Sequence, residues 1–204
     1  LVGEDGVTHH GVFDMAAFGA VPGLTIAAPM NEPELRNMMY TALGSGHPFM
    51  IRYPRGHGEG LPWRGEKFET LPVGRGRRLR EGADVALLTV GTVGNAAARA
   101  AGRAAAEGVS VAHYDLRFVK PLDEALLDEV GRKFRRVVTV EDGSLRGGVG
   151  EAVAAFFNGR GYDVRVQRLG IGDEWVEHGT PGQLYALCGY DEEGILRALL
   201  DTRA

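Results

Sequence analysis

Residues 85–171 alternate between strand-like and helix-like patterns, and this alternation restricts the fold more than any other feature of the sequence. Apolar runs at residues 85–90, 109–114 and 137–140 predict buried strands, and the segments at about 95–107 and 122–134 between them predict helices. The pattern continues with a helix at about 149–157, a strand at 164–171 and a last helix capped by Asp191. Such alternation favours an α/β fold with a mostly parallel, helix-covered sheet.

Residues 24–55 predict a strand, a helix and a second strand. Asn31 with Glu34 three residues later is typical of a capping box that opens a helix. Apolar residues at helical spacing predict one core-facing side of this helix: Leu35, Met38, Met39, Ala42 and Leu43. Residues 1–3 predict the end of a buried strand that enters a loop. Because no initiator methionine precedes them, we interpret the start as a cut within a domain.

Residues 57–83 differ in character from both flanking regions. They are rich in glycine and contain four arginines between residues 75 and 80, a charge run that favours a solvated surface over an anion site. We therefore predict three parts: residues 1–56 as a partial first domain, 57–83 as a linker and 84–204 as a second domain.

Composition narrows the classes of function. Of the 204 residues, 44% are hydrophobic and 25% are charged, as in a globular protein, and the net charge of −4 offers no basic field for nucleic acid. No apolar run approaches the ~20 residues that span a bilayer, so we expect no membrane partner. The single Cys188 excludes an internal disulfide framework and favours an inert thiol in a reducing cytoplasm.

The loop at residues 5–11 (DGVTHHG) holds the densest group of reactive side chains. It directly follows the predicted strand end, where open α/β sheets bind ligands. His9 and His10 offer proton donors and acceptors near neutral pH, and Asp5 would orient one ring. The alternative, that the histidines brace the loop, has equal weight on this pattern alone. A metal site is less favoured, because no other ligand cluster lies at a suitable spacing.

Two further segments are candidates for anion binding. Arg52 and Arg55 lie at the end of the predicted strand 49–53, and an arginine at a strand end either binds phosphate or is an ordinary surface residue. The glycine-rich turn at residues 141–151 lacks a proper G-x-G-x-x-G fingerprint. Close packing between strand and helix explains its glycines better than a phosphate site does.

Six short segments together carry a family resemblance. In the first half they are residues 5–14 (DGVTHHGVFD), 28–29 (AP) and 51–56 (IRYPRG), and in the second half 115–123 (DLRFVKPLD), 170–173 (GIGD) and 178–181 (HGTP). They resemble the pyrimidine-binding and C-terminal domains of the 1-deoxy-D-xylulose-5-phosphate synthase family of transketolase-like enzymes, over essentially the whole chain. The D-G-x-T-H motif is common to the whole superfamily, whereas R-Y-P-R-G and the segment at 170–179 narrow the resemblance to the synthase family.

The resemblance implies a reaction and a set of roles. The family condenses pyruvate with glyceraldehyde 3-phosphate, with loss of carbon dioxide, using thiamine diphosphate and magnesium, for isoprenoid and thiamine biosynthesis. It implies that His9 and Asp5 line the substrate channel, that His9 exchanges protons with substrate oxygens, and that Arg55 binds the acceptor phosphate. Arg52 and His10 receive no role. A cytoplasmic homodimer is implied as well.

Two parts of the family pattern are missing from this sequence. The first domain, which holds the diphosphate through the metal, is absent, and so is the cofactor-activating glutamate, since Glu4 stands in the wrong place. We therefore expect no cofactor-binding or metal-binding residue here, dependence on the missing N-terminal domains, and no turnover by this chain alone. The alternatives are a segment of a transketolase or of a 2-oxo acid dehydrogenase β subunit, and a catalytically silent dimerisation module.

Overall fold

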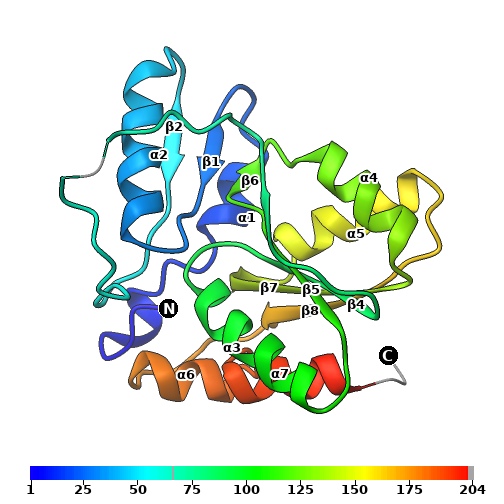
Figure 1. Cartoon of the computed structure of the whole chain (residues 1–204). Coiled ribbons are helices and arrows are strands. Elements are labelled where there is room, and N and C mark those ends of the chain that lie inside the picture. Colours follow the sequence, from blue (N-terminus) through cyan, green and yellow to red (C-terminus); the bar gives the residue numbers. More distant parts are fainter. Residues whose placement is uncertain (66, 202–204) are drawn as a thin grey trace.

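A computed structural model describes residues 1–65 and 67–201, and Figure 1 shows helices packed against two sheets. In this part of the chain the larger sheet has the strand order β3 (Arg77–Arg80), β5 (Val111–Asp115), β4 (Val85–Thr89), β7 (Arg136–Ser144) and β8 (Arg165–Ile171). The edge strand β3 runs antiparallel to β5, and the other neighbours are parallel. The predicted mostly parallel sheet is thereby confirmed.

Helices cover both faces of the larger sheet. α4 (Glu124–Lys133) and α5 (Val149–Gly159) lie on one face, and α3 (Val93–Ala106), α6 (Pro181–Leu187) and α7 (Glu192–Leu200) lie on the other side (Figure 1). Because side chains alternate along a strand, Leu87 packs in the core beside α3 and α7, whereas Leu88 packs in the core beside α4 and α5. Burial on both faces explains why the strands are continuous apolar runs in the sequence.

The smaller sheet joins the two halves of the chain. It pairs β1 (Thr25–Ala27) with parallel β2 (Phe49–Ile51) on one side and with antiparallel β6 (Phe118–Lys120) on the other. β6 follows β5 of the larger sheet after a turn at Arg117, whose φ of 58° is positive. Main-chain pairing therefore connects the halves in addition to side-chain packing.

Ionic contacts reinforce this connection beside α2 (Glu32–Gly44). The Glu34 carboxylate accepts hydrogen bonds from Arg77 at 2.9 Å and from Arg117 at 2.8 and 2.9 Å. Arg77 also donates to buried Asp115 at 3.1 Å. Burial raises the pKa of Asp115 to about 6, although Arg77 opposes the shift. Asn31 caps α2 as predicted by accepting from the Glu34 amide at 3.1 Å, but the Glu34 side chain contacts arginines and does not complete a capping box.

The predicted apolar face of α2 is wrong in its position. Met38 is fully buried, but Met39 is 55% and Leu43 is 88% exposed. The helix instead buries a mixed face that includes Asn37 and Thr41, because these polar groups have partners: the Thr41 hydroxyl donates to the Asn37 carbonyl and accepts from the Leu71 amide. Satisfied polar groups can be buried at little cost, and hydrophobic periodicity alone does not reveal them.

Two other expectations are also corrected. The predicted linker at 57–83 contains the strand β3. β3 lies at the edge of the sheet, where side chains are solvated, so its arginines gave no sign of a strand in the sequence. Residues 1–3 are not in a strand, because they bond to the following loop: the Val2 amide donates to His10, and the Gly3 carbonyl accepts from the Gly6 amide.

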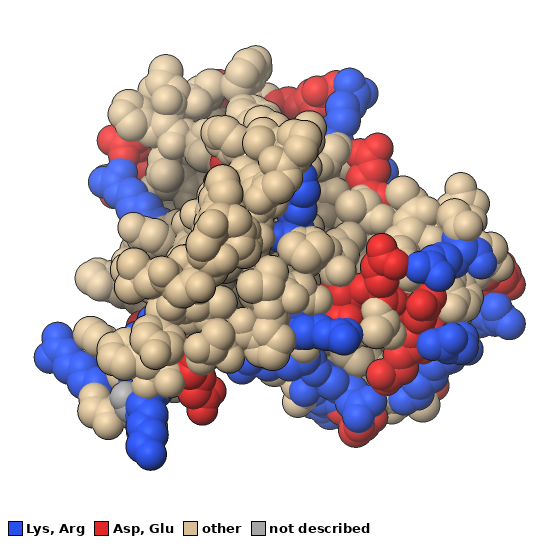
Figure 2. All heavy atoms as spheres, turned by 90° about the horizontal axis from the view of Figure 1, so that it is seen from above, with Lys and Arg blue, Asp and Glu red and all other residues tan. Residues whose placement is uncertain are grey.

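Charges of both signs are mixed on the surface above α4 and α5. Figure 2 shows lysine or arginine and aspartate or glutamate side chains interspersed there, and Arg160 after α5 pairs with Glu124 of α4 at 2.7 Å. Among residues 1–65 and 67–201, none of the helices combines the length and the apolar character needed to cross a bilayer.

Candidate functional site

The loop after residues 1–3 is a compact turn that depends on glycine. It contains the short helix η1 (Gly6–Thr8), and the amides of His9 and His10 both donate to the Gly6 carbonyl. Gly6 has a φ of 68°, and a Cβ atom at this position would lie 3.2 Å from the Cβ of His178. The turn therefore requires glycine for its backbone conformation and for its close approach to the C-terminal half.

The two adjacent histidines have different environments. The His10 ring is bonded at both nitrogens: Nδ1 accepts from the Val2 amide at 3.2 Å, and Nε2 lies 3.3 Å from the Glu177 carbonyl oxygen. Since Nδ1 accepts, the proton resides on Nε2, which donates to Glu177. His9 is exposed, and its Nδ1 lies 2.9 Å from the Thr8 hydroxyl. His10 thus braces the loop, while His9 remains accessible to a ligand.

Asp5 and Arg55 meet in the folded chain. Arg55 follows β2, and its guanidinium donates to the Asp5 carboxylate across 50 residues of sequence. The Arg55 side chain is 61% and the Asp5 side chain 38% exposed, so this ion pair contributes at most about 1 kcal/mol. Structure therefore brings together the loop and the strand end that the sequence marked as separate candidates, and it leaves the arginine available for a stronger anionic partner.

Arg52, three residues earlier, points inward. Its Nε donates to Asp14 at 3.3 Å, its Nη1 lies 3.5 Å from the Asp142 carboxylate, and its Nη2 donates to the Asp142 carbonyl. Asp142 is buried at the carboxyl half of β7 and also accepts from the Tyr190 hydroxyl at 2.8 Å. Burial and this carboxylate raise the pKa of Tyr190. Sequence reasoning included Asp142 only as part of the glycine-rich turn at 141–151, and it missed Tyr190.

The glycine-rich turn at 141–151 is a packing device. The Glu141 carboxylate accepts from the amides of Val149 and Gly150 at 2.9 and 2.8 Å, at the start of α5. Burial raises the pKa of Glu141. A Cβ atom on Gly148 would lie 2.2 Å from the Ser144 carbonyl oxygen. These helix amides already bind a carboxylate, which supports the packing interpretation over a phosphate site.

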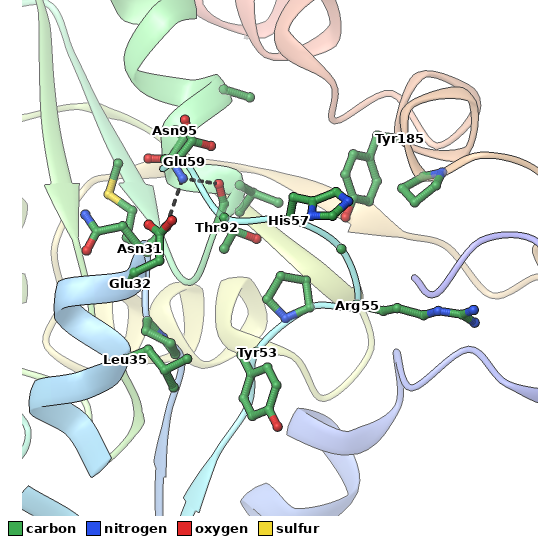
Figure 3. A pocket seen from close by; sticks show the side chains of 18 of the residues that line it. Asn31, Glu32, Leu35, Tyr53, Arg55, His57, Glu59, Thr92, Asn95 and Tyr185 are labelled. Atoms are coloured by element: carbon green, nitrogen blue, oxygen red, sulfur yellow. Dashed lines mark hydrogen bonds between the residues drawn. The ribbon is translucent and has the colours of Figure 1, made fainter. Parts of the chain in front are cut away.

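Two cavities flank the segment that carries Arg55. The larger, about 480 Å³, lies between the first turns of α2 and α3 and residues 53–59. Figure 3 shows that the Arg55 side chain points away from this cavity. The Asn95 side-chain amide in the cavity wall donates to the main-chain carbonyls of Met30 and Thr92 at 2.8 and 3.1 Å. The smaller, about 220 Å³, is lined by Asp14, Arg52 and Arg55 among others. Arg55 thus borders both spaces, with its charged group directed at the loop.

A metal site is not evident in the part of the chain that the structure describes. There, no group of three or more His, Cys, Asp or Glu side chains could hold a metal ion. Cys188 is half-buried, and burial raises the pKa of its thiol, which disfavours the reactive thiolate.

Comparison with known families finds two matches. The family described as "Transketolase, pyrimidine binding domain" matches residues 1–59, and "Transketolase, C-terminal domain" matches residues 74–195. Two solved structures are similar. A protein titled "Split gene transketolase, inactive beta4 tetramer" has a TM-score of 0.82 and 28% identity, over 95% of this chain and 61% of its own. The transketolase of Campylobacter jejuni has a TM-score of 0.76 at 18% identity, over 98% of this chain and 30% of its own, and shows the fold alone.

Curated relatives are similar at higher identity. Proteins named 1-deoxy-D-xylulose-5-phosphate synthase are 56% identical in Bacteroides fragilis, over 100% of this chain and 32% of the relative, and 45% identical in Symbiobacterium thermophilum, over 94% of this chain and 30% of the relative. The chain therefore spans about a third of the length of the curated relatives that it matches.

Proposed function

This chain belongs to the transketolase family, and from that premise we propose that it carries the C-terminal part of a 1-deoxy-D-xylulose-5-phosphate synthase. The complete enzyme would condense pyruvate with glyceraldehyde 3-phosphate and release carbon dioxide, with thiamine diphosphate and magnesium. We propose that residues 1–56 belong to a first domain, that the second domain predicted at 84–204 extends back to include β3, and that the working form is a cytoplasmic homodimer. Identity of 45–56% to curated synthases supports the choice of this enzyme over other members of the family.

The Asp5–Arg55 contact is the observation that carries the acceptor part of the proposal. A phosphate dianion binds a guanidinium through charge-assisted, bidentate hydrogen bonds, which are stronger than an exposed arginine–carboxylate pair. Glyceraldehyde 3-phosphate would therefore displace Asp5 from Arg55 on binding. The phosphate would then hold the aldehyde beside the loop that presents His9.

His9 is the residue we assign to proton transfer. Its ring is exposed on the loop, unlike that of His10, which is occupied at both nitrogens. An accessible imidazole can donate a proton to the aldehyde oxygen as that oxygen gains charge, or remove one from a substrate hydroxyl. Asp5, freed from Arg55, would lie on the same loop and favour the orientation of the acceptor.

Thiamine diphosphate is the cofactor implied by the family. The described residues contain no metal-ligating cluster for its diphosphate. We assign no residue of this chain to the cofactor. We propose that the remaining parts of the complete enzyme bind it.

The Arg55→Ala variant of the complete synthase tests the proposal. A hydrogen bond between an arginine and a charged group contributes roughly 1.5–3 kcal/mol to binding. We therefore expect the KM for glyceraldehyde 3-phosphate to rise about 10- to 150-fold, with the KM for pyruvate within about twofold. Unphosphorylated glyceraldehyde should be used equally well by variant and wild type. Steady-state kinetics with both substrates varied measures these constants.

Arg135→Ala is the matched control, because Arg135 is an arginine 77% exposed that pairs with an aspartate, Asp163, at 3.7 Å. Its kinetics should equal those of the wild type. An unchanged KM for glyceraldehyde 3-phosphate in Arg55→Ala would refute the phosphate assignment. A complete protein with no synthase activity at all would favour the alternative of a catalytically silent dimerisation module.

A further inference from the structure

Arg52 bridges two carboxylates that come from different parts of the fold. Asp14 begins α1 (Asp14–Gly19), directly after the loop with Asp5 and His9, and Asp142 belongs to β7 of the larger sheet. The Arg52 side chain is 12% exposed, against 61% for Arg55. A guanidinium held in place by two partners and removed from water has little freedom to move.

Asp142 is a fixed end of this bridge. The Asp142 side chain is 4% exposed. Tyr190, which is 1% exposed, donates a hydrogen bond from its hydroxyl to one carboxylate oxygen of Asp142 at 2.8 Å. The Arg52 amide is anchored as well, since it donates to the Ala27 carbonyl of β1 at 2.8 Å. Both the backbone and the charged head of Arg52 are therefore tied to the sheets.

The other end of the bridge is the loop. The start of α1 touches β7 through one additional main-chain bond, from the Ser144 amide to the Val12 carbonyl at 2.9 Å. Arg52 adds the side-chain contact at Asp14, five residues after His9. Downstream, only Tyr53 and Pro54 separate Arg52 from Arg55, and the fixed φ of proline limits the freedom of that connection.

We propose that Arg52 is a positioning residue that sets the loop bearing His9 and the strand end bearing Arg55 at a fixed separation. The inference rests on the proposed function, because it assumes that His9 acts on the substrate that Arg55 binds. Misplacement of a reacting group by about 1 Å can cost on the order of 100-fold in rate, so loss of the bridge should act mainly on turnover.

A double-mutant cycle in the complete synthase separates positioning from general stabilisation. Arg52→Met keeps a side chain of similar length but removes the charge and the donors. We expect it to lower kcat about tenfold or more in the wild-type background and less than about twofold in the His9→Ala background, because there is no longer a correctly placed imidazole to lose. Arg52→Lys, which keeps the charge without the planar fork, should recover part of kcat.

Two additional variants provide a second test of the bridge and a control for the loss of an arginine. Asp14→Asn weakens the loop end of the bridge with little change of shape and should show the same dependence on His9, so it serves if Arg52→Met does not fold. Arg135→Met, the exposed control, should leave kcat unchanged in both backgrounds. Far-ultraviolet circular dichroism and thermal unfolding establish that each variant is folded at the assay temperature.

Equal losses of kcat in the two backgrounds would overturn the positioning role and leave the proposed function intact. Full turnover by His9→Ala alone would refute the assignment of His9 and the positioning role with it. A loss confined to the wild-type background supports both.

Discussion

Two buried titratable residues on β5 should give the chain opposing dependences of stability on pH. Burial, with Arg77 and Arg80, lowers the pKa of His113 from 6.5 to about 4, and burial raises the pKa of Asp115 from 3.8 to about 6. The folded state thus favours the neutral form of both side chains. For His113 the unfolded chain binds more protons between pH 6.5 and 4, so its contribution to stability is lost as the pH falls through that window. For Asp115 the folded chain binds more protons between pH 6 and 3.8, so its contribution is gained as the pH falls.

The two contributions have nearly equal size. A pKa difference of one unit corresponds to ~1.4 kcal/mol, so the change for His113 from 6.5 to about 4 amounts to about 3 kcal/mol. The change for Asp115 from 3.8 to about 6 also amounts to about 3 kcal/mol. In the wild type these contributions nearly cancel between pH 6.5 and 4, and single substitutions should reveal each of them.

Two variants separate the contributions. His113→Gln keeps a polar side chain that can bond to Thr89, the partner of His113 at 2.9 Å, and it cannot titrate. As the pH falls from 7 to 4, the free energy of unfolding of His113→Gln should rise by about 3 kcal/mol relative to that of the wild type. Asp115→Asn should lose about 3 kcal/mol over the same range, and the double variant should follow the wild type.

Urea unfolding followed by far-ultraviolet circular dichroism at half-unit pH steps measures these differences. Trp63 and Trp175 are 41% and 71% exposed, which makes tryptophan fluorescence the poorer probe. Both variants will lose some stability at every pH from altered contacts, and only the change with pH tests the reasoning. If the difference between each variant and the wild type is flat from pH 7 to 4, the two residues do not have the shifted pKa values described above.

Two other outcomes are expected. Gly148→Ala should lower the free energy of unfolding by about 3 kcal/mol or more, because its Cβ would lie 2.2 Å from the Ser144 carbonyl oxygen. Gly159→Ala, with open space around its Cβ, should change the free energy of unfolding by less than about 1 kcal/mol. Urea unfolding compares the two variants. Because burial raises the pKa of its thiol, Cys188 should react with iodoacetamide at pH 8 several-fold more slowly than free cysteine. Mass spectrometry of timed samples measures the two rates, and equal rates would contradict the prediction.

The larger sheet was predictable because local pattern and tertiary environment agree there. β4 is buried along its whole length, so its apolar run signals a strand directly. β3 was not predictable, since an edge strand tolerates arginines that read as a solvated segment. The buried face of α2 was also missed, because Glu34, Asn37 and Thr41 are stabilised by partners far away in sequence.

The candidate site was predictable in its parts and not in its assembly. Asp5, His9 and Arg55 carry chemical patterns that a sequence displays, but contact between Asp5 and Arg55 depends on where β2 ends relative to the loop. The distinction between His9 and His10 depends on Glu177, 167 residues from His10. Likewise, Arg52 and Arg55 look equivalent in the sequence and differ because Arg52 meets Asp14 and buried Asp142, whereas Arg55 meets exposed Asp5.

Several contacts to the loop come from the C-terminal half of the chain, although the loop lies in the segment matched by the pyrimidine-binding family. His10 donates to Glu177, the Gly179 amide donates to the Gly3 carbonyl at 3.4 Å, and Gly6 packs against His178. The turn at residues 3–10 has a positive φ at both Gly3 and Gly6 and has little regular structure of its own, so these contacts select its conformation. A substitution at residues 176–181 should therefore be interpreted first through its effect on the placement of His9, even though none of these residues has been assigned to the chemistry.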